Sequence, residues 1–215
     1  MEFDGLAHWF ITFLCNYNCH YCFFKSKPNK FFLSNDLIVN FWDKTNKVWK
    51  FKFTGGEPFL YPNFIDLCSK LSQKHIVSID TNLSLSLPNL DDFIKRVVPQ
   101  RVFLILAAMN ERNESEMELF TKKARTLLDA GFNLNTNYVL HPTRYNTVDK
   151  TVDILKSNNI SCTIKQFLGI HNGKSYRCLM KAIYSKNILI KRLKKISSNP
   201  KTILLCVVLA IIMLW

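Results

Sequence analysis

The first 170 residues alternate between short apolar runs and amphipathic stretches. The apolar runs have strand length and are rich in aromatic and β-branched residues, which predicts six strands at 7–13, 48–54, 75–81, 101–108, 133–140 and 160–168. Apolar residues recur at helical spacing between these runs, which predicts helices at about 34–47, 63–73, 89–98, 114–130 and 147–158.

The fourth predicted helix has the clearest end signals. Asn113 can cap its start, Glu116 follows three residues later as in a capping box, and Gly131 comes after its last turn. Strands that alternate with helices in this way predict an α/β domain with parallel strands and right-handed crossovers. The periodicity alone fits an open doubly wound sheet and a barrel equally well.

The composition is that of a folded protein, with 48% hydrophobic and 21% charged residues. The net charge of +13 suggests nucleic acid until it is mapped along the chain. Nine of the 29 lysines and arginines lie in residues 171–215, which contain no acid, so residues 1–170 carry 20 basic and 16 acidic residues. We therefore expect a core domain at 1–170 without a basic stripe and a basic C-terminal extension at 171–215, and a nucleic-acid partner is not favoured.

The N-terminal residues include two acids and no basic segment before an apolar run, unlike a signal peptide. Seven cysteines in a chain that is not expected to be exported indicate a reducing compartment and metal or redox chemistry rather than a disulfide framework. The expected location is cytoplasmic.

Three of the cysteines stand together in CNYNCHYC, directly after the first predicted strand, as Cys15, Cys19 and Cys22. Thiolates are good ligands for soft metals, and three in one loop can hold three irons of an iron–sulfur cube while the fourth iron stays open. The alternative is a zinc site with His20 or a distant residue as the fourth ligand. The spacing is unlike that of most zinc fingers, which favours the cluster.

The second predicted strand runs into GGEP, formed by Gly55, Gly56, Glu57 and Pro58. This is the carboxyl end of a strand, where α/β folds place their ligands. The glycines let the backbone approach a ligand closely, and Glu57 offers a carboxylate to a cationic group. A GGEP turn alone is weak evidence, because turns are rich in glycine and proline.

Together, CxxxCxxC and GGEP on a βαβ frame resemble the radical S-adenosylmethionine (SAM) superfamily over about residues 7–170. The resemblance implies a partial (β/α)6 barrel of the TIM-barrel-like type. It implies a 4Fe–4S cluster whose three irons are bound by Cys15, Cys19 and Cys22, with SAM chelating the fourth iron through its amino and carboxylate groups.

The resemblance also implies positions for SAM around these motifs. Tyr21 matches the aromatic position whose neighbourhood contacts adenine, and the motif Gly55–Pro58 would hold the methionyl amino group. Asp80, Thr81 and Asn82 stand where the family often has a polar TNG-like segment near the ribose and methionyl part, although Leu83 replaces the glycine.

The implied reaction is reductive. An electron passes through the cluster to SAM, which is cleaved to methionine and a 5′-deoxyadenosyl radical that abstracts hydrogen from a substrate whose identity the sequence leaves open. Candidate catalytic or substrate-contacting residues are Asn137 on the fifth predicted strand, His141 at its end and Lys165 on the sixth. The expected partners are SAM, the substrate and an electron donor.

Two further readings remain open. One is a non-catalytic protein, decayed or truncated from such an enzyme, that binds the cluster or SAM and is tethered by its tail.

The other concerns the tail itself, since residues 203–215 are all apolar but would span only about 20 Å as a helix. That is short for a bilayer core of about 30 Å, so the segment packs on the barrel, contacts a membrane surface or partner protein, or marks a truncated chain.

Overall fold

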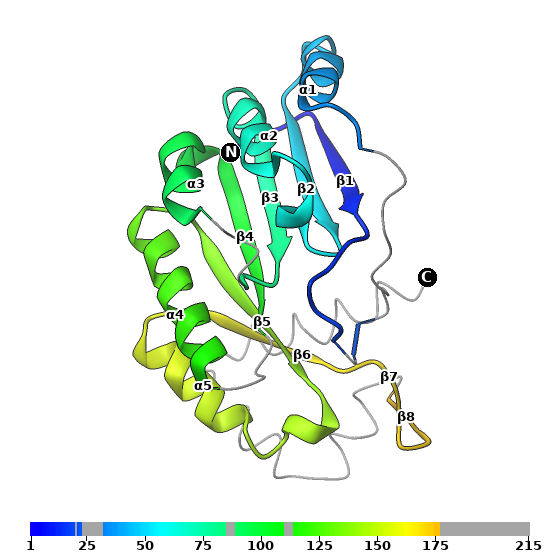
Figure 1. The fold of residues 1–215 in the computed structure, drawn as a ribbon, viewed down its shortest axis with the longest axis vertical. Helices are drawn as coiled ribbons and strands as arrows, with labels where there is room; N and C mark the ends of the chain where they lie inside the picture. Colours follow the sequence, from blue (N-terminus) through cyan, green and yellow to red (C-terminus); the bar gives the residue numbers. More distant parts are fainter. Residues whose placement is uncertain (20, 23–31, 85–88, 110–113, 177–215) are drawn as a thin grey trace. The chain divides into compact units, whose positions relative to one another are not determined.

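A computed structural model describes residues 1–19, 21–22, 32–84, 89–109 and 114–176. Its strands and helices follow the predicted order, with boundaries a few residues apart (Figure 1). The strands of the main sheet are β1 (Gly5–Thr12), β2 (Trp49–Gly55), β3 (Ile76–Thr81), β4 (Val102–Met109), β5 (Leu134–Leu140) and β6 (Cys162–Gln166). The helices are α1 (Asn35–Asp43), α2 (Phe64–Leu71), α3 (Leu90–Arg96), α4 (Glu114–Asp129) and α5 (Val148–Ser157).

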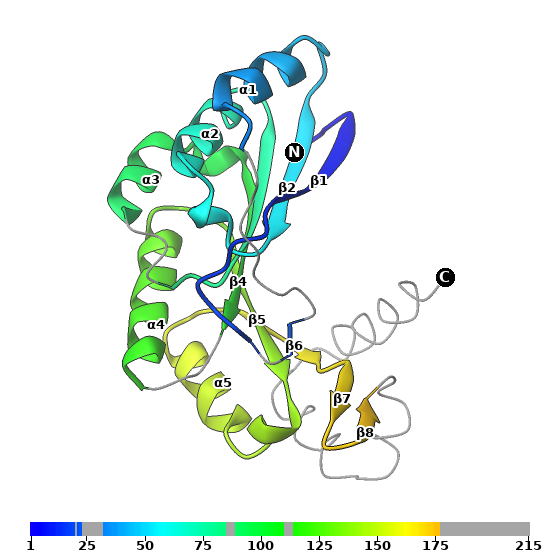
Figure 2. The same ribbon diagram turned by 45° about the vertical axis from the view of Figure 1, so that its right-hand side comes forward.

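The main sheet is parallel and its strands lie side by side in chain order, β1 to β6. In the described residues each connection carries one α-helix, three connections also hold a short 3-10 helix, and the α-helices lie along one side of the sheet (Figure 2). In the described part of the chain β1 and β6 are the two edges of this sheet. The predicted α/β class and partial (β/α)6 barrel are therefore confirmed.

Side chains alternate between the two faces of the sheet, as the pleat requires. Phe51, Phe53, Val77 and Ile79 are completely buried, and Phe53 meets Phe64 of α2 edge to face with ring centres 5.4 Å apart. Packing of these apolar side chains against the helices supplies most of the hydrophobic core.

The opposite face of the sheet is mixed in character and partly exposed. Phe10 of β1 is 43% exposed and Phe103 of β4 is 40% exposed. The ammonium of Lys50 lies 3.0 Å from the centre of the Phe103 ring, and Lys52 pairs with Asp80 at 3.3 Å. We call this surface the open face.

Gly131 ends α4 as predicted. Its φ is +85°, a conformation that glycine adopts without the steric cost that a side chain would bring, and its N–H bonds back to the carbonyl of Leu128. Asn113, the predicted cap at the other end, lies outside the described residues, so its role remains a prediction.

Two compact units are distinguished within the chain. The first comprises Met1–Val139 and Asn146–Ile164, and the second comprises Leu140–Tyr145 and the chain from Lys165 onward. The second unit contains an antiparallel hairpin of β7 (Gly169–His171) and β8 (Lys174–Tyr176), which we did not predict. Its turn residues Asn172 and Gly173 both have positive φ, so the Asn-Gly pair was a usable hairpin signal.

The basic and apolar tail at 177–215 lies outside the described residues, and with it Cys178 and Cys206. In the part of the chain that is described, we find no helix with the length and apolarity needed to cross a membrane. The three readings of the tail remain predictions.

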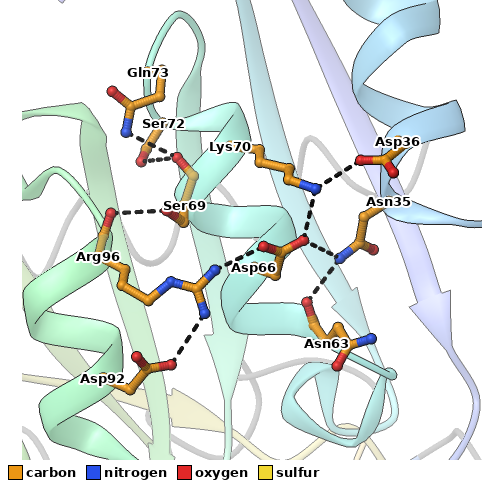
Figure 3. Close-up of polar contacts among 10 residues, drawn as sticks. All are labelled: Asn35, Asp36, Asn63, Asp66, Ser69, Lys70, Ser72, Gln73, Asp92 and Arg96. Atoms are coloured by element: carbon orange, nitrogen blue, oxygen red, sulfur yellow. Dashed lines mark hydrogen bonds and ion pairs between the residues drawn. The ribbon is translucent and has the colours of Figure 1, made fainter.

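A polar network joins the first three helices on their outer side (Figure 3). Its centre is Asp66 of α2, which accepts hydrogen bonds from Asn35 at 3.0 Å and pairs with Arg96 at 2.7 Å and Lys70 at 3.1 Å. Lys70 also reaches Asp36 at 2.7 Å. The hydrogen bond from Asn35, followed by the two cations, lowers the pKa of Asp66 although partial burial opposes them.

We expect Asp66→Asn to reduce the free energy of unfolding at pH 7 by about 1–2 kcal/mol, since three charge-assisted contacts weaken together. A lowered pKa contributes stability above the pKa of the unfolded chain and loses it as pH falls through the folded value. The difference between wild type and variant should therefore shrink as the pH falls through the lowered pKa of Asp66. Urea unfolding at several pH values checks this, with exposed Asp153→Asn as a control that stays within about 0.5 kcal/mol of wild type. A difference that persists at low pH would contradict the assignment.

Candidate functional site

Three predicted motifs meet at one edge of the sheet. The cysteine loop follows β1, GGEP follows β2, and Thr81-Asn82 ends β3. These strands are neighbours and parallel, so their carboxyl ends lie together. All three motifs belong to the first compact unit.

The backbone after β1 is hydrogen-bonded to the GGEP turn. The N–H of Gly56 donates to the carbonyl of Thr12 at 2.8 Å, and the N–H of Glu57 donates to that of Leu14 at 2.7 Å. A Cβ on Gly55 would lie 2.2 Å from the Thr12 oxygen, and one on Gly56 would lie 2.0 Å from the Leu14 oxygen. Both glycines are therefore required because the chain after β1 passes directly against them.

The carboxylate of Glu57 is completely buried at the end of β2. Its Oε1 accepts hydrogen bonds from the Phe59 N–H at 3.1 Å and the Thr81 hydroxyl at 2.9 Å, and its Oε2 accepts one from the Asn82 N–H at 2.7 Å. Burial raises its pKa to about 7, and these hydrogen bonds act in the opposite direction. Glu57 thus ties the GGEP turn to the end of β3.

Lys123 of α4 is a residue of this site that sequence reasoning missed. It donates a hydrogen bond to the backbone carbonyl of Ser84, and its positive charge favours the ionised form of Glu57. Burial lowers the pKa of Lys123, while the charge of Glu57 raises it. In the sequence, Lys123 follows Lys122 in an amphipathic helix and has the appearance of a solvent-exposed charge.

The first cysteine is held by asparagine side chains. The amide of Asn82 donates to Asn16 Oδ1 at 2.8 Å and points to Cys15 Sγ at 3.9 Å, and the amide of Asn16 donates to the Ser84 hydroxyl at 2.7 Å. The N–H of Tyr17 also donates to Cys15 Sγ at 3.4 Å. Burial raises the pKa of the Cys15 thiol, and these N–H donors partly offset that effect.

The other two cysteines lie in a turn in which the Cys22 N–H donates to the Cys19 carbonyl at 2.9 Å. None of the three cysteines forms a disulfide within the described part of the chain, and there no three Cys, His, Asp or Glu side chains converge on one metal ion. In an iron–sulfur cube each thiolate binds a different iron, so its ligands do not meet at one point. Three thiols in one loop, with N–H donors around the Cys15 sulfur, fit such a cluster. His20, the alternative zinc ligand, lies outside the described residues.

Tyr21 connects the cysteine loop to the end of β4. Its hydroxyl lies 3.5 Å from the carbonyl oxygen of Met109 at the end of β4. The loop therefore contacts the ends of three successive strands after its own.

The position expected to hold glycine in a TNG-like segment has a left-handed backbone even though it is leucine. Leu83 has φ +50° and is 1% exposed. Its N–H bonds to the Thr81 hydroxyl at 3.0 Å, the same hydroxyl that donates to Glu57. Burial of the leucine side chain compensates for a conformation that costs about 1–2 kcal/mol.

The three candidate catalytic residues do not all belong to the same compact unit. Asn137 lies half-buried on β5 in the first unit, whereas Lys165, exposed on β6, and His141 belong to the second. His141 is 2% exposed, with Nδ1 2.8 Å from the Thr143 hydroxyl and its ring 4.5 Å from that of His171.

Comparison with known proteins gives one match at the level of families. Residues 9–164 match the radical SAM superfamily. A 68-residue stretch is 38% identical to an uncharacterized protein of Methanocaldococcus jannaschii, covering 29% of this chain and 23% of that protein.

Solved structures with the same fold include SuiB of Streptococcus suis bound to S-adenosylmethionine, with a TM-score of 0.66 and 15% identity over 89% of this chain and 48% of that one. SuiB was also solved with its precursor peptide SuiA, with a TM-score of 0.64 and 16% identity over 87% of this chain and 46% of that one. The structure of anSMEcpe with bound AdoMet has a TM-score of 0.59 and 18% identity, over 80% of this chain and 54% of that one. The chain thus spans about half the length of these proteins. Since the family match covers 156 of its 215 residues, the chain belongs to the radical SAM superfamily.

Proposed function

We propose that the chain is a radical SAM enzyme that holds a 4Fe–4S cluster on Cys15, Cys19 and Cys22 and binds SAM at the adjoining ends of β2 and β3. When bound, these two groups supply an electron and a 5′-deoxyadenosyl radical for hydrogen abstraction. The observation that carries the proposal is the direct attachment of the cysteine loop to Gly56 and Glu57. One hydrogen-bonded unit thereby joins the thiols to the expected SAM-binding turn.

Within this proposal, the turn Gly55–Pro58 receives the methionyl amino group. A carboxylate has about four lone-pair positions, and Glu57 uses three on protein donors, so one acceptor position would remain for SAM. Thr81 and Asn82 hold Glu57 and the cysteine loop in place and would contact the ribose and methionyl part, and Tyr21 would lie near the adenine.

The substrate class is proposed by analogy with the structural relatives. SuiB is described with a precursor peptide, and anSMEcpe with the peptides Cp18Cys and Kp18Cys. We propose that this enzyme likewise acts on a peptide, draws its electron from a separate donor and works in the cytoplasm. Residues 171–215 are then the part that contacts a partner protein or a membrane surface.

Anaerobic reconstitution with iron and sulfide, followed by dithionite and SAM, tests the cofactor assignment. The wild type is expected to turn brown and release 5′-deoxyadenosine, and Cys19→Ala should lose both properties because one iron loses its thiolate. The matched control is Cys162→Ala, a half-buried cysteine of β6 that should keep both.

The possible results separate the functions. A cluster without SAM cleavage would replace the enzyme with a non-catalytic cluster-binding protein. Tight zinc binding without a cluster would refute both.

The buried carboxylate gives a prediction for the cluster-free protein. The pKa of Glu57 is raised from 4.5 to about 7, so the folded chain binds the proton more tightly and stability falls as pH rises between these values. The expected loss is about 3 kcal/mol, at about 1.4 kcal/mol for each pKa unit. In Glu57→Gln this contribution should be absent.

The measurement is urea unfolding from pH 4.5 to 8, comparing the pH slope of each variant with that of wild type. Exposed Glu118→Gln serves as the control and should keep the wild-type slope. An unchanged slope in Glu57→Gln would show that Glu57 is ionised throughout this range.

A further inference from the structure

Two oxygen atoms on the open face of the sheet are buried and have no hydrogen-bond partner among the residues that the structure describes. One is Oδ1 of Asp80 on β3, whose Oδ2 pairs with Lys52 at 3.3 Å. The other is Oδ1 of Asn137 on β5. A buried acceptor without a partner costs about 1–3 kcal/mol, so two on one face require an explanation.

The strand register places both residues on that face. Asp80 is level with Leu106 of β4, Leu106 is level with Asn135 of β5, and Asn137 lies two residues further along. Their neighbours Ile79 and Thr136 point to the opposite face, where the helices pack, and are completely buried.

Other polar side chains of the open face are satisfied within the protein. The Ser78 hydroxyl donates to the Leu104 carbonyl at 3.0 Å, and the amide of Asn135 donates to the Thr163 hydroxyl at 3.0 Å. Among the described residues of the open face, Asp80 and Asn137 are the ones with such an oxygen, and both oxygens can only accept; the hydroxyl of Thr136 on the opposite face is also buried without a partner.

We propose that Asp80 and Asn137 form a substrate subsite that accepts N–H or O–H donors of a peptide. The inference rests on the proposed function, which gives the enzyme a peptide substrate. Two strand spacings of about 4.8 Å and two residue steps of about 3.3 Å separate the two positions, giving about 12 Å. An extended peptide covers that distance with three to four residues. On β4, between them, the small Ala108 is level with Asn137 and Leu106 is level with Asp80.

Charge selects the kind of group that binds. Lys52 neutralises one oxygen of Asp80, and the remaining oxygen keeps acceptor character, so an amide, hydroxyl or amine is favoured over a carboxylate. This selection is the property to be measured.

The probes are the blocked tripeptides Ac-Ala-Asn-Ala-NH2 and Ac-Ala-Asp-Ala-NH2, which differ only in a donating amide or an anionic carboxylate. We expect the asparagine peptide to shift the backbone amide NMR signals of residues 80 and 137 in a saturable way. The aspartate peptide should bind at least about tenfold more weakly, since its side chain offers the orphan oxygens no donor. Equal or reversed affinity would overturn the subsite, as would saturation without shifts on β3 and β5.

Two variants test the residues themselves. Asn137→Leu should weaken the asparagine peptide about tenfold while leaving Tm unchanged or higher, because it removes an orphan oxygen. Asp80→Asn should cancel the preference for the asparagine peptide, because its new amide donates where an oxygen accepted. The control Ser78→Ala loses an internal hydrogen bond, so it should lower Tm and leave peptide affinity within threefold. A lower Tm in Asn137→Leu, or an unchanged preference in Asp80→Asn, would refute the proposal.

The proposed function and this subsite fail in different ways. If wild type releases 5′-deoxyadenosine but neither peptide shifts the signals of β3 and β5, the subsite is wrong and the enzyme stands. If the asparagine peptide binds as described and no SAM is cleaved, the subsite stands and the enzyme is wrong.

Discussion

The buried carboxylate of Glu57 is the interaction on which the site depends. It accepts from the turn after β2 and from both the side chain and the backbone at the end of β3. The backbone N–H of the same residue holds the chain after β1. One residue therefore fixes three strand ends in relation to one another, and it does so at the cost of keeping a carboxylate out of water.

The sheet separates stability from chemistry by its two faces. The face toward the helices is filled with phenylalanine, isoleucine and valine, and the outer side of the helices is braced by the Asp66 network. The open face carries lysine, aspartate and asparagine instead, together with exposed aromatic rings. Successive residues of each strand point to opposite faces of the sheet. One set of alternate residues can therefore pack the core without constraining the residues of the open face.

The sequence was sufficient for most of the fold because strand and helix periods repeat over the first 170 residues, and the cysteine and GGEP motifs stood at strand ends. The contacts between these motifs could not be predicted from the sequence pattern. Lys123 reaches Ser84 across 39 positions, and Asn16 reaches Ser84 across 68, so no local pattern marks them. Leu83 was noted for replacing glycine, yet only the structure shows that it keeps the left-handed backbone. The Asn172-Gly173 hairpin signal was present and overlooked.

The hydrogen bonds around the cysteine loop also impose an order on events during synthesis. Cys15, Cys19 and Cys22 leave the ribosome first, but the groups that position Cys15 arrive with Gly56, Glu57 and Asn82, 34 or more residues after Cys22. Until β2 and β3 have emerged and paired, the loop has none of these restraints. If the cysteines hold the proposed cluster, its insertion into a formed site would have to wait until residue 84 has emerged, and the thiols would need to stay reduced and free of stray metal during that interval.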